Sequence, residues 1–180
     1  MKTIPAIVAG VLALAAALPE RATAQASGEK AVRCPATLPA PVAARQRGIL
    51  AAARAGDYAA LRREVTAPNR FQADFDVPRD PAPAWQEARK QGIDIIGAVA
   101  AIFAMPCSVL KAEGTTLYNF PSALDFRWAE LMPAERVPLE RFYGAKINQQ
   151  WLEGRIKGYY VGWRGIIEAD GTWTAFVAGD

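Results

Sequence analysis

The chain has 180 residues, 52% of them hydrophobic and 22% charged, and its formal net charge is +3. So small a basic excess gives no reason to expect a nucleic-acid partner, because such binding depends on clustered Lys and Arg. The chain has no histidine, which excludes Ser-His-Asp and Cys-His nucleophilic systems and the usual transition-metal sites. We therefore expect neither a metal nor a cofactor.

The first 24 residues have the pattern of a cleavable signal peptide. Lys2 is followed by an uncharged apolar run from Ile4 to Leu18, and Ala22-Thr23-Ala24 provides a small-x-small cleavage site. The run is shorter than the roughly 20 residues that span a bilayer, which disfavours the alternative of an uncleaved anchor. We expect a periplasmic or secreted protein with no membrane span after cleavage.

The two cysteines, Cys34 and Cys107, both follow the predicted cleavage site. An even number of cysteines in an exported protein favours a disulfide between them. Two buried free thiols are the alternative.

After the signal peptide, residues 25–41 are polar and then Pro-rich, which predicts an extended lead-in. A helix is expected over 42–55. Asp57 is a good N-cap for a second helix over 58–65. The loosely alternating segment 71–76 is either a short strand or an extended loop.

Two further helices carry clear start signals. Asp80 followed by Pro81 begins a helix that extends to Gln91. Asp94 is the N-cap of the most apolar helix in the chain, 95–104, which Pro106 ends.

The second half of the chain changes towards strand patterns. Segments 108–110 and 115–120 flank a loop with Gly114 and predict a hairpin. Residues 122–132 and 138–143 are expected to form short helical pieces separated by prolines.

The C-terminal segment has the strongest strand signal. Residues 159–167 and 172–178 are rich in aromatic and β-branched side chains and flank Asp170-Gly171, a strong hairpin turn. Helices first and strands last predict an α+β fold, with residues 42–180 as a single domain.

This hairpin also holds the aromatic cluster that is the main candidate binding site. On a two-stranded ribbon one face packs on the helices and the other meets water, where aromatic rings beside an arginine bind a protein or a glycan. The alternative is that the rings form the core of a small domain. The candidate residues are Tyr159, Tyr160, Trp163, Arg164, Trp173 and Phe176.

Asp74 and Asp76 are the best candidates for acid–base chemistry, because residues two apart on a strand share a face. A solvated face beside buried apolar residues is the blander interpretation. Arg62 and Arg63 suit an anion site, but the polar face of a helix is the favoured interpretation.

Two segments resemble known families. The ending Asp170-Gly171-Thr172-Trp173 with Phe176-Val177-Ala178-Gly179-Asp180 resembles the terminus of a set of uncharacterised exported bacterial proteins, a resemblance that implies no activity. Residues 52–61 are similar to the first helices of the SnoaL/NTF2-like fold, which cups small ligands. That fold needs several long strands in a curved sheet, whereas residues 81–104 predict helix, so we do not expect it.

These patterns favour an exported, non-enzymatic domain that binds a protein or an envelope glycan through an aromatic C-terminal β face. The alternative is a small-ligand pocket or a carboxylate enzyme of NTF2-like type that uses Asp74 and Asp76. A deep enclosed cavity would favour the alternative, and a solid core with an aromatic outer face would favour the binding domain.

The signal-peptide interpretation predicts where the mature chain begins. N-terminal sequencing of the exported protein is expected to return Gln25 or a residue next to it, because signal peptidase cleaves after the small-x-small site. Recovery of an exported chain that still begins with Met1 would contradict this expectation.

Overall fold

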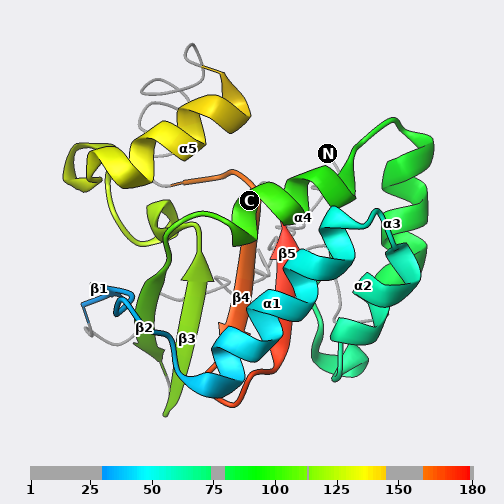
Figure 1. Ribbon diagram of the computed structural model, residues 1–180, viewed down its shortest axis with the longest axis horizontal. Helices are drawn as coiled ribbons and strands as arrows, with labels where there is room; N and C mark the ends of the chain where they lie inside the picture. Colours follow the sequence, from blue (N-terminus) through cyan, green and yellow to red (C-terminus); the bar gives the residue numbers. More distant parts are fainter. Residues whose placement is uncertain (1–29, 74–79, 113, 145–159, 179–180) are drawn as a thin grey trace, which may run out of the picture.

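The computed structural model describes residues 30–73, 80–112, 114–144 and 160–178. These residues form an antiparallel sheet covered on one face by helices, with the C-terminal hairpin last in the chain (Figure 1). The predicted α+β fold is therefore confirmed. The predicted signal peptide lies outside the described residues.

The helices begin where the aspartate caps predict. Asp57, Asp80 and Asp94 each accept a hydrogen bond from a backbone N–H of the first helical turn, at 2.8, 3.0 and 2.8 Å. Three single 3₁₀ turns lie over Pro68–Arg70, Ser122–Leu124 and Trp128–Glu130. The α-helices are α1 (Ala40–Arg54), α2 (Tyr58–Glu64), α3 (Pro81–Lys90), α4 (Ile95–Phe103) and α5 (Pro133–Tyr143).

Two stretches differ from the sequence-based expectation. The segment expected to be an extended lead-in includes a short strand, and α1 begins at Ala40, because Pro41 in the first turn needs no N–H partner. The helical piece expected over 122–132 consists of two 3₁₀ turns, and the piece expected over 138–143 begins earlier, because α5 starts at Pro133 and continues through Pro138. The next residue, Leu139, is 1% exposed, so tertiary packing holds the helix together despite the lost hydrogen bond.

The sheet contains two hairpins and a short N-terminal edge strand. Its order is β1-β2-β3-β4-β5, and all neighbours are antiparallel. Gly114 and Gly171 have φ of 80° and 88° in the two tight turns, a conformation that favours glycine. Both predicted hairpins are thus confirmed. The strands are β1 (Val32–Arg33), β2 (Ser108–Ala112), β3 (Thr115–Phe120), β4 (Arg164–Glu168) and β5 (Trp173–Val177).

Strand β4 is shorter than the sequence predicts, because it begins at Arg164 instead of residue 159. The Tyr160 hydroxyl donates to the carbonyl oxygen of Trp163 at 2.7 Å. Gly162 lies so close to the Tyr143 and Tyr160 rings that a Cβ there would overlap them. Residues 160–163 therefore fold onto α5, whose last residue is Tyr143, and do not extend the ladder.

Helices α1 and α4 cover one face of the sheet (Figure 1). Helix α1 contributes aliphatic side chains such as Ile49, and α4 contributes the ring of Phe103. Phe103 at the end of α4 lies 5.1 Å from Phe120, 5.5 Å from Trp173 and 6.2 Å from Phe176, measured between ring centroids. Gly165 of β4 leaves the space for Phe103, since a Cβ there would overlap the ring. A glycine in mid-strand is explained by this close approach.

A second aromatic group places α3 against the sheet. Phe71 lies 5.0 Å from Trp173 and 6.0 Å from Trp85, and the two tryptophans are 6.0 Å apart. Trp85 is 3% exposed, and Trp173 is fully buried. This group holds α3 in place through Trp85, which also lines a hollow between α3 and α2.

Trp173 and Trp163 make a matched pair for testing the core. Trp173→Ala is expected to cost about 3–5 kcal/mol of unfolding free energy, because a fully buried ring with several ring neighbours is removed. Trp163→Ala is expected to cost less, since that side chain is half-buried and, among the described rings, stacks on Phe176. Urea unfolding of both variants measures the difference. Equal losses would contradict this assignment of the core.

Candidate functional site

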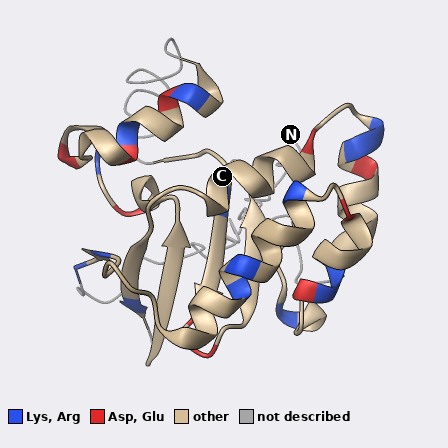
Figure 2. Cartoon of the chain, viewed as in Figure 1, with Lys and Arg blue, Asp and Glu red and all other residues tan. Residues whose placement is uncertain are grey.

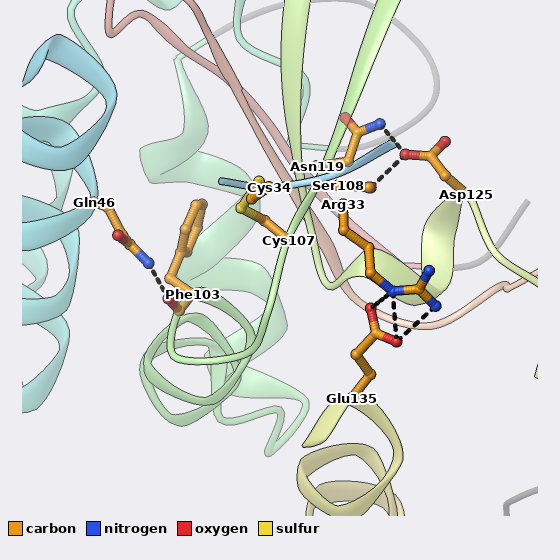
Figure 3. Close-up of a disulfide and its surroundings, with 9 residues drawn as sticks. All are labelled: Arg33, Cys34, Gln46, Phe103, Cys107, Ser108, Asn119, Asp125 and Glu135. Carbon is orange, nitrogen blue, oxygen red and sulfur yellow. Dashed lines mark hydrogen bonds and ion pairs between the residues drawn. A yellow bond between two sulfur atoms is a disulfide. The ribbon is translucent and has the colours of Figure 1, made fainter. Parts of the chain in front are cut away.

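The predicted disulfide joins β1 to the segment after α4. Cys34 and Cys107 are bonded, with Cα atoms 5.4 Å apart, and the bond closes a separation of 73 residues (Figure 3). Such a closure contributes about 4 kcal/mol in the chain-entropy model. A hollow of about 280 Å³ lies beside it. The pair is present in the structure and is compatible with an oxidising compartment.

An ion pair between the half-buried Arg33 and the buried Glu135 borders the same hollow. Both Glu135 oxygens accept from Arg33, at 3.1 Å each (Figure 3). Burial would raise the pKa of Glu135, but the backbone N–H of Met132, the Arg33 guanidinium and the Ser122 hydroxyl outweigh burial and hold the pKa below its ordinary value. Glu135 is therefore an ionised structural carboxylate and a poor general acid.

A second polar cluster lies close to the disulfide. Ser108 and Asn119, opposite each other on β2 and β3, donate to the same Asp125 oxygen at 2.5 and 2.7 Å (Figure 3). Ser108 is fully buried and Asn119 is 2% exposed. A hydroxyl that no substrate reaches is not a nucleophile. This cluster holds the 3₁₀ turn before Asp125 against the sheet.

The predicted binding residues of the hairpin divide between the core and its margin. Tyr160 is 5% exposed, and Trp173 and Phe176 are fully buried, so these three follow the core alternative that the sequence left open. Trp163 and Arg164 are half-buried. Tyr159 lies outside the described residues. The six side chains therefore do not share one outer face.

The phenols near the end of α5 have a structural role. The hydroxyls of Tyr143 and Tyr160 lie 2.8 Å apart, and the Tyr143 hydroxyl accepts from the Trp163 N–H at 2.8 Å. Burial raises the pKa of both phenols, and that of Tyr160 lies well above its ordinary value. Both are neutral at physiological pH and serve as hydrogen-bonding groups.

The most suitable binding site is a hollow between α2 and α3, on the far side of the helical layer from the disulfide. It encloses about 300 Å³, at the lower end of the range for small-ligand sites. Its lining combines two aromatic rings, two arginines, one amide and two alanines. We call it the Tyr58–Arg89 hollow, and its residues are Tyr58, Ala59, Arg62, Ala82, Trp85, Gln86 and Arg89.

A second hollow of about 440 Å³ adjoins it and shares Tyr58 and Arg89. The Arg89 guanidinium lies over the Tyr58 ring, 5.6 Å from the centroid. These two side chains therefore stand between two concave surfaces. A ligand larger than one hollow has room to continue past them.

Arg62, one of the arginines that the sequence associates with an anion, lines the hollow but already has a partner. Its Nε and one terminal nitrogen bond the two Asp80 oxygens at 2.6 Å each. The Arg62 guanidinium and the Ala82 N–H hold the pKa of Asp80 below its ordinary value. Arg63 is exposed and does not line the hollow.

Sequence reasoning did not find this hollow as a site. The available signal was spacing, since Tyr58 and Arg62 are four residues apart on α2, and Trp85 and Arg89 are four apart on α3. Each pair therefore lies on one helix face. The sequence does not reveal that the two faces meet.

Asp74 and Asp76 lie outside the described residues. Within the described ranges, no three His, Cys, Asp or Glu side chains are grouped closely enough to bind a metal ion. None of the helices in that part of the chain is both long enough and apolar enough to cross a membrane.

Comparison of the chain with protein-family models, with curated proteins and with solved structures finds no match in any of the three. The resemblance of the C-terminal residues to exported bacterial proteins therefore stays a prediction. The functional argument depends on the geometry alone.

Glu135→Gln tests the structural role of the ion pair between Arg33 and Glu135. Because the folded-state pKa lies below the ordinary value of 4.5, ionised Glu135 stabilises the protein fully above that pH. This stabilisation is lost as the pH falls through the lowered folded-state pKa. Urea unfolding from pH 7 to pH 3 is expected to show wild type more stable than the variant at neutral pH, with a difference that narrows below about pH 4.5. A pH-independent difference would contradict this role.

Proposed function

We propose that the protein is an exported, non-enzymatic domain that binds a component of the cell envelope in the Tyr58–Arg89 hollow. The observation that carries the proposal is the lining of this hollow, where aromatic rings, an amide and a guanidinium that has no carboxylate partner in the described part of the chain converge on a concave surface. Ligand sites in proteins have this composition.

The polar clusters in the described residues favour binding over catalysis. Glu135 is paired with Arg33, and Asp125 is hydrogen-bonded by Ser108 and Asn119. General acid–base catalysis needs a group that can exchange a proton with a substrate. Each of these clusters instead supports the fold.

The alternative is an NTF2-like cup with Asp74 and Asp76 as acid and base. In the described residues, aromatic rings fill the space between the sheet and the helices. Phe103, Phe120 and Phe176 are all fully buried there. This filling favours a solid core and a ligand site on the outside of the helices.

Export is the second part of the proposal. The basic and apolar start of the chain with its Ala22-x-Ala24 site supports secretion. The Cys34–Cys107 bond is compatible with an oxidising compartment such as the periplasm or the exterior. An envelope glycan or an envelope protein is the kind of partner available there.

The hairpin stays a competing location for the site. Trp163 and Arg164 are half-buried at its margin, so a partner on the C-terminal β face would contact these two residues first. The hollow is the better candidate for the binding site, because it is concave and contains an exposed guanidinium.

Binding of the mature, oxidised protein to immobilised glycan and protein fractions of a cell envelope tests the proposal. Arg89→Gln and Tyr58→Ala are expected to weaken binding at least about tenfold, in keeping with losses at central contact residues. Arg63→Gln is the matched control, since it removes an exposed arginine of α2 that does not line the hollow, and it is expected to bind like wild type.

The same measurement on Trp163→Ala separates the two locations. Binding that is lost in Trp163→Ala and retained in the hollow variants would overturn the hollow and assign the hairpin. Circular dichroism confirms that each variant is folded. Absence of binding to every fraction would overturn the proposed function.

A further inference from the structure

Arg89 has no carboxylate partner among the described residues, although acidic side chains lie near it in the sequence. Asp80 is paired with Arg62, and Glu87 is paired with Lys90 at 3.2 Å. Arg89 is exposed, and its guanidinium lies over the Tyr58 ring. The hollow therefore contains one uncompensated positive charge.

The other acidic residues around the two hollows, Asp57 and Asp94, are helix N-caps. The Asp57 carboxylate accepts from the Ala60 N–H, and the Asp94 carboxylate accepts from the Gly97 N–H. Asp94 borders the adjoining hollow but faces the start of its own helix. Glu64, the acidic residue of α2, is paired with Arg45, so no described carboxylate on α2, α3 or α4 is left to neutralise Arg89.

Trp85 supplies a second, independent observation. It lines the hollow and is 3% exposed, and its indole N–H has no hydrogen-bond acceptor. A buried donor without an acceptor is unfavourable and rare in folded proteins. The nitrogen is covered in the structure, so an oxygen atom of a ligand seated against Trp85 would satisfy this donor once the side chains over the nitrogen move apart.

From these features we infer that the ligand of the Tyr58–Arg89 hollow is a sugar acid, a sugar ring that carries a carboxylate. The inference rests on the proposed function and specifies its ligand. Guanidinium and indole N–H groups are donors only, so they select an acceptor, and a carboxylate offers two oxygens to a guanidinium. A single uncompensated charge suits a monoanion better than a phosphate dianion.

The rest of the lining suits a sugar ring. Gln86 offers both a donor and an acceptor, and the Tyr58 hydroxyl offers both as well, which matches the hydroxyl groups of a sugar. The volume of about 300 Å³ accommodates one ring. Ala59 and Ala82 provide a small apolar surface, and they do not form a pocket for a large peptide side chain.

The test is a titration of the oxidised mature protein, ¹⁵N-labelled, with D-glucuronate and with D-glucose, followed by NMR. Glucuronate is expected to shift the Trp85 indole resonance and to bind at least about tenfold more tightly than glucose. Arg89→Gln is expected to abolish this preference, whereas Arg63→Gln is expected to retain it. Trp85→Phe identifies the indole resonance.

Each of the other possible results of this titration overturns one stated part of the inference. Equal binding of glucose and glucuronate in the hollow would overturn the inference that the ligand carries a carboxylate, but it would not contradict the proposed function. Stronger binding of glucose 6-phosphate than of glucuronate would do the same. Tighter binding of N-acetyl-alanyl-alanine would overturn the sugar in favour of a peptide terminus. If neither sugar binds while an envelope fraction binds in a Tyr58-dependent manner, the sugar-acid inference alone fails.

Discussion

The contact between Phe103 and Gly165 determines how the two layers of the molecule meet. Phe103 ends α4, and its ring occupies the space that a side chain on β4 would otherwise fill. From there it touches rings of β3 and β5, among them Trp173. Trp173 in turn packs against Trp85 of α3. The position of α3, and with it the Tyr58–Arg89 hollow, therefore depends on a chain of ring contacts that begins at one glycine.

This chain of contacts also explains where a ligand site is available. A domain of this size needs large apolar side chains to bury enough surface, and the C-terminal hairpin supplies them. Trp173 and Phe176 are committed to the core and cannot also form an outer face. The helices α2 and α3 lie to one side of the sheet, beside α1 (Figure 1), and keep their polar faces exposed. Figure 2 shows that charged residues gather on the helices and are scarce on the strands, so the helical side offers most of the charges that a charged ligand could pair with.

Local chemistry made much of the fold predictable. Short sequence patterns predict the capping role of Asp57 and the turn at Gly171. The expected export of a chain with two cysteines predicts the Cys34–Cys107 bond. Features that depend on packing between distant residues were not predictable. Helix α5 continues through Pro138 because its neighbours hold it, and the hollow exists because two helix faces, each unremarkable alone, are brought together.

Both borders of the sheet are shielded from other chains. On one side, the two residues of β1 pair with β2, and the disulfide fastens them there. On the other side, the Gln72 N–H donates to Thr174 at 2.8 Å, and the Gln72 carbonyl accepts from Phe176 at 2.9 Å. An open border would act as a template for a strand from a neighbouring molecule. The two-residue strand β1 at one edge and the pairing of Gln72 at the other leave few free backbone N–H and C=O groups. The sheet is therefore a poor template for polymerisation.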